Sequence, residues 1–560
     1  MNEIPAAASM IGVLARSDEH DTVREFFELF KTPWEFCRPD RRYQVVLQAD
    51  GGRPEGNADV VLVYGCEATA FDHSRRRLPG TPRRSPTLRW DEASLPIYGT
   101  AVPFAVKDGA ADVVMADTGE PVTWSSRSEG KTVVRVGYDL FREIRHLLTQ
   151  GQPPAYASIP TVERHIALLR SWIMAAGIPL VEIPPVPAGH RFTVCLTHDL
   201  DHPSLRFHRF DHTTFGFLYR AVIGSFIKTC QGRISLSSLR RNISAALALP
   251  FVHLGWAEDF WFQFDRYLQI EKGLASTFFV IPFKGDPGRT TEGAAPNLRA
   301  PAYAVADIAD RVKSLANAGS EVGVHGIDAW LDANRGSEER DAVSRVAGTP
   351  AAGIRMHWLY FDDESPARLE QVGFAYDSTF GYNETVGFRA GTLQAFRPLT
   401  ARQLLELPLH VMDTALFYPS HLDLTPEAAK KTVLPLIDAA ERHGGVLTIN
   451  WHDRSIAPER LWGDFYLDLL DELKRRDPWF PTAAQAVAWF HRRRAARFEQ
   501  QADGSVVVQA SASAESLPGL TVRTHKPGLS EWPLRALRRA DFTDALLGDS
   551  VDARAAVSCP

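Results

Sequence analysis

The sequence predicts an α/β fold built on a parallel sheet or an α/β barrel over about residues 190–495. Two observations support this prediction. Short apolar runs of strand length alternate with longer segments that have the period of an amphipathic helix, a pattern typical of repeated strand–helix units. Several of these runs also end abruptly in acids, histidines or an arginine, as strands do when they deliver side chains to one edge of a sheet. Because the chain has 560 residues, we expect further domains around this one.

The first expected strand is the apolar run 192–196, which stops at Thr197-His198-Asp199-Leu200-Asp201. Start and stop signals mark the helices: Gly319 and Gly373 follow two of them, and Thr425 with Pro426 begins a third. The later strands are expected at 275–281, 321–324 and 446–449, and the helices at 305–318, 366–372, 425–443 and 482–494.

The remaining sequence predicts a smaller α/β accessory domain at 1–185, with strands at 43–47 and 60–64 and a helix at 138–148. The proline-rich segment 183–187 is a stiff, extended boundary. An insertion of mixed character occupies about 203–255. A short β-rich tail is expected at 496–540, followed by a disordered end at 541–560.

Composition excludes several classes of partner and location. A net charge of −6 gives no reason to expect a nucleic acid partner. Five scattered cysteines, without the spacing of a metal site, suit a reducing compartment. The N-terminus has neither the basic leader nor the apolar core of a signal peptide, and no apolar run approaches the ~18 residues of a membrane span. We therefore expect a cytoplasmic protein with no membrane span.

Reactive side chains follow four of the expected strands. Asp199 and Asp201 follow the first strand, and His325 follows the strand at 321–324. Arg355 and His357 follow Gly353-Ile354, and Asn450-Trp451-His452 follows the strand at 446–449. Because the carboxyl ends of parallel strands meet at one edge or rim, we expect these side chains to share a site.

These residues carry a resemblance to a known family. Thr197-His198-Asp199-Leu200-Asp201 resembles the first motif of polysaccharide deacetylases (the NodB-homology domain, carbohydrate esterase family 4), and Glu321-Val322-Gly323-Val324-His325 resembles the start of their metal-histidine motif. Further similar segments are Ala275-Ser276-Thr277-Phe278-Phe279-Val280, Gly353-Ile354-Arg355, Phe374-Ala375-Tyr376-Asp377-Ser378 and Leu447-Thr448-Ile449-Asn450-Trp451-His452. The resemblance covers about 300 of the 560 residues and implies a distorted (β/α) barrel.

The resemblance also implies roles for individual residues. Asp199 would be the general base, His452 the general acid, and Asp201 and His325 ligands of a divalent metal, most readily Zn²⁺. Arg355 would hold Asp199 ionised, and Asp377 would fix Arg355 through a fork-shaped pair. Trp451 would wall the substrate pocket or stack on a sugar, or would simply pack the barrel.

The chain departs from the family at the second metal histidine, where Ala329 stands. We expect Asp328 to replace it as third ligand, with His357 next and His202 as a further alternative; His357 otherwise would bind substrate. If none of them binds, the site is incomplete and the protein is catalytically silent. The pair His208 and His212 has the spacing of a helical zinc site, but a surface or core role is the stronger interpretation.

The expected function is therefore a metal-dependent carbohydrate deacetylase that acts on N- or O-acetyl groups, with a glycan or an activated sugar precursor as partner, in cell-surface polysaccharide metabolism. Two alternatives stay open. A related barrel could hydrolyse other C–N bonds in small molecules, and a degenerate barrel could bind carbohydrate without catalysis.

Overall fold

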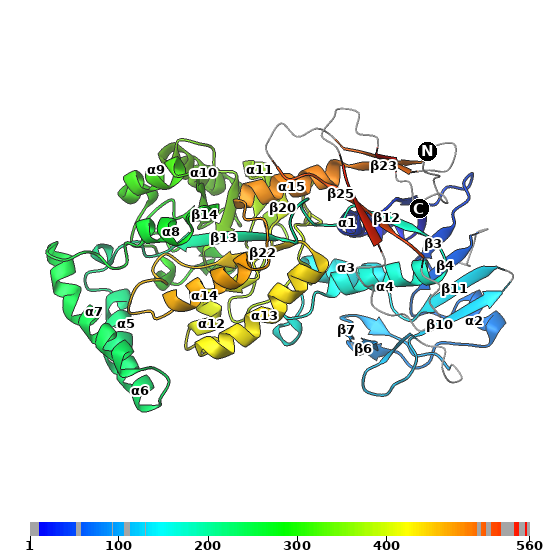
Figure 1. Cartoon of the computed structure of the whole chain (residues 1–560), viewed down its shortest axis with the longest axis horizontal. Coiled ribbons are helices and arrows are strands. Elements are labelled where there is room, and N and C mark those ends of the chain that lie inside the picture. The colour runs from blue at the N-terminus through cyan, green and yellow to red at the C-terminus, as the bar shows by residue number, and fades with distance from the viewer. Residues whose placement is uncertain are drawn as a thin grey trace. The chain divides into compact units, whose positions relative to one another are not determined.

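The structure is a computed structural model that describes residues 10–51, 58–91, 93–105, 112–128, 130–500, 506–510, 517–527, 542–547 and 555–556 (Figure 1). The chain divides into two compact units. Unit 1 comprises Met1–Gly189, Ala390–Leu399 and Ala488–Pro560, and unit 2 comprises His190–Arg389 and Thr400–Val487.

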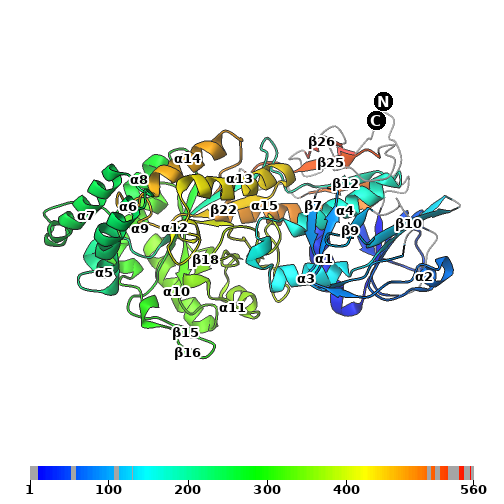
Figure 2. The same cartoon turned by 90° about the horizontal axis from the view of Figure 1, so that it is seen from below.

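Unit 2 is built on an eight-stranded sheet in which every neighbouring pair is parallel, as the alternation of strands and helices predicts. In sheet order the strands are β20 (Leu405–Glu406), β19 (Tyr376–Asp377), β18 (Gly353–Met356), β17 (Glu321–Gly326), β14 (Ser276–Val280), β13 (Thr193–Leu200), β22 (Val446–Asn450) and β21 (Val411–Met412). The helices around it are α8 (Phe264–Ile270), α9 (Ala309–Asn317), α10 (Ala333–Ala347), α11 (Ser365–Val372), α12 (Asp413–Phe417), α13 (Pro426–His443), α14 (Gly463–Lys474) and the first turn of α15 (Ala483–Ala495) (Figures 1 and 2).

The two edge strands of this sheet, β20 and β21, are consecutive in the chain and separated only by residues 407–410. A flat sheet of eight strands would be roughly 34 Å wide at about 4.8 Å per strand, whereas five residue steps reach at most roughly 18 Å. The sheet must therefore curl. Hydrogen bonds show how it closes: Leu407 N–H donates to the Asp377 carbonyl of β19, and His410 N–H donates to the Thr448 carbonyl of β22. The extended segment from β20 to β21 thus seals the sheet into a barrel.

The strands are apolar because both of their faces are covered. All eight residues of β13 are buried, as are all five of β14 and of β22. These strands therefore lack the alternation of apolar and polar residues that a half-exposed strand shows. Close packing also demands glycine in β18: a Cβ at Gly353 would lie 1.8 Å from Cζ of Tyr376 on β19. β13 extends beyond the expected run 192–196 and carries Asp199 within it.

The insertion expected at 203–255 is helical and belongs to unit 2. It contains α5 (His212–Leu218), a π-helical turn (Tyr219–Gly224), α6 (Ser225–Cys230) and α7 (Leu236–Leu254), which project away from the strands of the barrel (Figures 1 and 2). A small core joins Phe217 and Val252 of the insertion to Trp261 and Ala457, which lie outside it. Among the described residues, no helix is long and apolar enough to cross a membrane.

Unit 1 contains a six-stranded sheet in the order β10-β11-β4-β3-β1-β2, parallel except for the β10–β11 pair. Its strands are β1 (Ile11–Leu14), β2 (Trp34–Phe36), β3 (Val45–Gln48), β4 (Val60–Tyr64), β10 (Thr123–Ser128) and β11 (Lys131–Val136), with helices α1 (His20–Phe30), α2 (Ala70–Arg75), α3 (Leu140–Thr149) and α4 (Thr161–Ala175). A second, antiparallel sheet joins β6 (Thr87–Trp90), β7 (Ala93–Pro96) and β9 (Val113–Met115), and β5 (Arg83–Arg84) pairs with β8 (Thr100–Ala101).

The end of the chain was expected to form a short β-rich tail at 496–540. Its described strands group with unit 1, where β25 (Thr521–His525) pairs with β12 (Leu180–Glu182). The pairing is reinforced by a buried hydrogen bond between His525 and Glu182 at 2.7 Å. β26 (Phe542–Leu546) falls in the segment expected to be disordered and pairs with β25; β23 (Arg497–Gln500), β24 (Val506–Gln509) and β27 (Ala555–Ala556) form a further sheet. Residues 541, 548–554 and 557–560 lie outside the described residues.

Candidate metal and catalytic site

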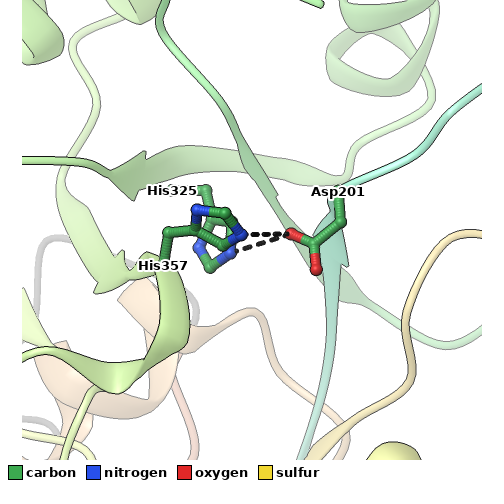
Figure 3. A group of neighbouring side chains, drawn as sticks. All are labelled: Asp201, His325 and His357. Atoms are coloured by element: carbon green, nitrogen blue, oxygen red, sulfur yellow. Dashed lines mark ion pairs between the residues drawn. The ribbon is translucent and has the colours of Figure 1, made fainter. Parts of the chain in front are cut away.

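A group of three potential metal ligands lies at the carboxyl ends of neighbouring strands in unit 2. Asp201 follows β13, His325 lies near the end of β17, and His357 follows β18. One ligand atom from each lies within 4.8 Å of the others. Oδ1 of Asp201 is 3.1 Å from Nε2 of His325 and 3.7 Å from Nε2 of His357, and both rings point at the carboxylate (Figure 3).

Hydrogen bonding prepares these atoms to bind a cation. Nδ1 of His325 is 2.9 Å from the carbonyl of Arg355, and because a carbonyl only accepts, Nδ1 carries the proton and Nε2 presents its lone pair to the cluster. Burial lowers the pKa of His357 to about 3, so this imidazole is neutral, as a ligand must be. Oδ1 of Asp201 is buried and has no hydrogen-bond donor. An unsatisfied carboxylate oxygen beside two imidazole nitrogens fits a divalent ion, and the Asp-His-His donor set suits zinc.

Asp328 does not join this group, so the expected third ligand is wrong. Its Oδ1 accepts a hydrogen bond from the backbone N–H of Arg289 at 2.7 Å, and its Oδ2 lies 3.3 Å from Nε of the same arginine. The expectation assumed that residues 325–328 form a helical turn, but β17 runs to Gly326, and the turn begins only at Asp328, whose carbonyl accepts from the N–H groups of Leu331 and Asp332. His357, our second choice, lies with Asp201 and His325 in the group of three potential ligands.

Asp199 is held in place from both sides. Its Oδ1 accepts from Nη1 of Arg355 at 2.9 Å, and its Oδ2 accepts from the side-chain amide of Asn450 at 2.7 Å. Burial acts to raise the pKa of Asp199, but Arg355 together with the neighbouring His325 and His452 outweighs it and holds that pKa below its usual range. Oδ2 of Asp199 also lies 4.0 Å from Nε2 of His325, beside the three-ligand group. An ionised carboxylate therefore faces the position where an ion would sit.

The partner expected for Arg355 is also wrong. Besides Asp199, its guanidinium donates to the hydroxyl of Thr197 and to the carbonyl and hydroxyl of Ser378, and it makes no fork-shaped pair with Asp377. Asp377 instead accepts from the hydroxyl of Thr379. It pairs with Glu406 across β19 and β20, and burial raises the pKa of both carboxyls. Asp377 is part of the barrel wall.

His452 lies on the other side of Asp201, with its Nε2 3.6 Å from Oδ2 of that residue. Its Nδ1 bonds Oδ1 of Asp413 at 2.6 Å, and its backbone N–H donates to Oδ2 of Asp413 at 2.8 Å. Burial acts to lower the pKa of His452, but the charge and hydrogen bond of Asp413 overcome it and raise that pKa to about 10. Asp413 was missed in the sequence; the signal is the short apolar pair Val411-Met412 that ends in an acid, the same pattern that marks Asp199.

The remaining sequence candidates have structural roles. Trp451 is fully buried, stacked 5.0 Å from Tyr466, and packs the barrel, which was the alternative to a pocket wall. His202 pairs with Nε2 of His208 at 3.0 Å and lies outside the three-ligand group. Nδ1 of His208 bonds Asp211 at 2.6 Å. In the part of the chain that is described, His208 and His212 belong to no metal-like cluster.

A cavity of about 600 Å³ opens over the three-ligand group. Trp358, the residue after His357, lines it, is 40% exposed and has a left-handed backbone (φ 63°), as does Leu359 (φ 54°). Two successive non-glycine residues in this region are strained, and such strain concentrates at functional sites. Trp462 lines the cavity as well, so aromatic faces border the candidate ligands.

Comparison with known proteins identifies the fold neighbours. No family model matches the chain, and no curated protein matches its sequence. Among solved structures, a protein from Mycobacterium smegmatis described as a polysaccharide deacetylase is 18% identical over 55% of this chain and 95% of that one, with a TM-score of 0.34. The chain is similar to polysaccharide deacetylases.

Two further structures extend the comparison. Agd3, described as a carbohydrate deacetylase, is 10% identical and aligns with 93% of this chain and 92% of its own, with a TM-score of 0.32. A pseudoenzyme of carbohydrate esterase family 4 from Bacillus anthracis is 12% identical over 53% of this chain and 65% of that chain, with a TM-score of 0.26. These include the family that the sequence motifs resemble.

Proposed function

We propose that this protein is a zinc-dependent hydrolase that removes an acetyl group from an N-acetylated or O-acetylated carbohydrate, in cell-surface polysaccharide metabolism. One observation supports it most strongly: Oδ1 of Asp201 is buried, lacks a hydrogen bond and lies 3.1 Å from Nε2 of His325 and 3.7 Å from Nε2 of His357. Asp201, His325 and His357 hold the ion in this proposal. When bound, zinc polarises a carbonyl and makes water a nucleophile near neutral pH.

Asp199 acts as the general base. Amide or ester hydrolysis at neutral pH requires a group that accepts a proton from the attacking water, and a carboxylate fixed in its ionised form meets that need. Arg355 and Asn450 each donate to a different oxygen of Asp199, so its orientation is set before substrate binds. General-base assistance of this kind contributes about 10²- to 10⁴-fold to the rate.

His452 acts as the general acid. Since Asp413 occupies Nδ1, the proton on Nε2 is the one available to the leaving group. The pKa of about 10 keeps the ring protonated at neutral pH until the amine or alcohol departs. Asp199 and His452 thus have opposite protonation states at the same pH, which is what paired base and acid catalysis requires.

The cavity lining supports a sugar as substrate. Trp358, which is 40% exposed and follows His357, places an aromatic ring in the cavity lining, and such rings bind the apolar sides of sugars while polar groups bind the hydroxyls. This class of substrate also accounts for a cavity of about 600 Å³, which is larger than a lone acetyl group needs.

The test is release of acetate from a panel of N- and O-acetylated sugars by the full chain. We expect hydrolysis that a chelator abolishes, that zinc restores, and that Asp199→Asn reduces by about 10²-fold or more. Asp328→Asn is the matched control, because its carboxylate serves Arg289, and it should keep activity.

Three outcomes would contradict the proposal. The first is hydrolysis unchanged by Asp199→Asn or by the chelator. The second is hydrolysis of cyclic amides in place of acetylated sugars, which would favour a different C–N hydrolase. The third is glycan binding that survives metal removal with no turnover, which would favour a non-catalytic carbohydrate-binding protein.

A further inference from the structure

The catalytic cavity contains a second polar region, away from the three-ligand group, formed by three arginines. Arg220 comes from the π-helical turn of the insertion, and Arg454 and Arg460 come from the loop after β22. Arg220 and Arg460 also line a neighbouring groove of about 650 Å³, whose apolar lining includes Phe217 and Ile227. The arginines therefore stand where two cavities adjoin.

These guanidinium groups lack anionic partners. Arg460 is 7% exposed, and its Nε and Nη2 bond to nothing; Nη1 of Arg454 is likewise buried without a partner. Among the described residues, none of the three arginines forms an ion pair with a carboxylate. Aromatic rings support them instead: Arg460 lies 4.9 Å from the ring centre of Trp462, and Arg454 lies 4.8 Å from that of Trp261.

Two acids lie nearby, but their hydrogen bonds go elsewhere. Glu459 accepts from the indole of Trp261 at 2.7 Å. Asp453 accepts from the backbone N–H of His202 and from the backbone N–H of Arg454, both at 2.8 Å. The local field is positive enough that Arg460, with Arg454 and Arg220, lowers the pKa of the Tyr418 phenol to about 7. Buried cations without counter-ions are costly, so this arrangement is typical of a site preorganised for an anion.

We propose that Arg220, Arg454 and Arg460 bind a phosphate group of the substrate while its acetylated sugar lies at the Asp201 group. This inference rests on the proposed function and names its substrate class, a sugar phosphate. The planar forks of several arginines match the oxygens of a phosphate. The adjoining groove provides space for whatever else the phosphate is esterified to.

Calorimetric titration with inorganic pyrophosphate tests the subsite without requiring catalysis. We expect binding by the full chain that weakens at least 10-fold in Arg460→Gln and in Arg454→Gln. Arg476→Gln is the matched control, because Arg476 is a surface arginine of unit 2 paired with Asp438 and Glu441, and it should bind as the wild type does. No binding of pyrophosphate by the wild type, or equal binding by Arg460→Gln and wild type, would overturn the subsite.

A second arm separates this inference from the proposed function. Pyrophosphate could bind a metal ion directly, so the titration is repeated with His325→Ala, which removes a proposed ligand. Binding that persists supports the arginine subsite even if no deacetylation is found, and binding that disappears contradicts it. Competition by a nucleoside diphosphate sugar and by a polyprenyl phosphate in detergent then assigns the source of the phosphate; either competitor supports the subsite.

The insertion carries an independent feature, an exposed apolar face. On α7, Leu236, Ile243, Leu247, Phe251 and Leu254 recur at helical spacing and are exposed, Leu247 by 69%. A second stripe runs along α5, the π-helical turn and α6 through Phe215, Tyr219, Val222, Ile223, Phe226 and Ile227. In the described residues most of the exposed large apolar side chains lie here, and a patch of this kind marks a surface that contacts an apolar partner.

The charge of the insertion indicates which partner. Residues 212–257 contain five basic residues and no aspartate or glutamate, although the whole chain has a net charge of −6. Arg220 lines the catalytic cavity, and Lys228 and Arg233 pair with Asp423; Arg240 and Arg241 of α7 form no ion pair among the described residues. Exposed apolar stripes beside such cations are typical of helices that lie in the interface of an anionic membrane. We infer that α5–α7 dock on an anionic lipid surface, on the part of unit 2 that projects from the barrel (Figure 2).

Co-sedimentation with vesicles tests this docking. The full chain should sediment with vesicles of about three parts phosphatidylcholine to one part phosphatidylglycerol and much less with pure phosphatidylcholine. Leu247→Asp and Phe226→Asp should each weaken binding at least 5-fold, whereas Leu467→Asp, at an exposed leucine of α14, should not. Equal binding by all variants would overturn the inference, and so would self-association of the chain that Leu247→Asp abolishes, since a second copy would then cover the face.

Discussion

Two buried arginines, one in each unit, differ in what surrounds them. In unit 1, Arg135 is fully buried and every nitrogen donates: Nε to both oxygens of Asp72, Nη1 to the carbonyls of Gly65 and Val136, and Nη2 to that of Glu67. In unit 2, Arg460 is almost as buried, yet its Nε and Nη2 have no partner. Burial alone therefore does not distinguish these two arginines, whereas the satisfaction of their hydrogen bonds does.

The same contrast holds for carboxylates. Asp72 accepts from Arg135, from the hydroxyl of Thr69 and from a backbone N–H at the start of α2. Asp201 keeps a buried oxygen without a hydrogen bond beside His325. A satisfied charge stabilises the fold, and an unsatisfied one is held ready for a ligand at a cost in stability.

The largest expected effect is on activity. Asp201→Asn replaces a proposed ligand with a weaker one and should reduce hydrolysis by at least about 10³-fold. Because the wild-type carboxylate is unsatisfied, the same variant should unfold at an unchanged or higher temperature, measured by calorimetry. Asp72→Asn is the control from the other unit and should lower the unfolding temperature. A clear loss of stability in Asp201→Asn would remove the distinction between the two acids.

For the two arginines, the substitution in unit 1 should reduce stability much more than the substitution in unit 2. Arg135→Met leaves Asp72 buried without its charge partner and should lower the free energy of unfolding by about 3–5 kcal/mol. Arg460→Met removes no ion pair and should change it by less than ~1 kcal/mol. Urea denaturation of both variants measures this difference, and similar losses in the two would contradict the comparison.

The general acid offers a pH test within the barrel. Asp413→Asn removes the charge that raises the pKa of His452, so the ring should lose its proton at lower pH. The alkaline limb of the pH–rate profile should move to lower pH, with a loss of about 10²-fold in kcat at pH 8. An unchanged limb would show that His452 is not the acid.

The smallest expected effect is again in unit 1. Burial raises the pKa of Asp112 to about 6 from its usual 3.8, while the Trp172 indole donates to it. The protonated form is favoured in the folded chain, so the stability it contributes is fully present below pH 3.8 and is lost as the pH rises through about 6. Asp112→Asn should therefore stabilise the chain by on the order of 1 kcal/mol at pH 7 and not at pH 3.5. A gain at both pH values would contradict this assignment.

Much of the barrel could be predicted from sequence because its strands are apolar runs that end in reactive residues. The strand at 446–449 and the helix from Thr425 lie within a residue of their expected bounds. The place of His357 in the three-ligand group could not be predicted, because sequence spacing favours Asp328, three residues after His325, over His357, which is 32 residues away. Only the path of the chain after Gly326 decides between them. The partners Asn450, Ser378 and Asp413 depend on strand neighbours up to 251 residues apart, which sequence spacing does not encode.

The central claim is that Asp201, His325 and His357 hold one divalent ion. Elemental analysis of the purified full chain measures it directly when wild type is compared with His357→Ala and Asp328→Ala. We predict one zinc per wild-type chain, retained in Asp328→Ala and lost in His357→Ala. Zinc that persists in His357→Ala and disappears in Asp328→Ala would contradict the account.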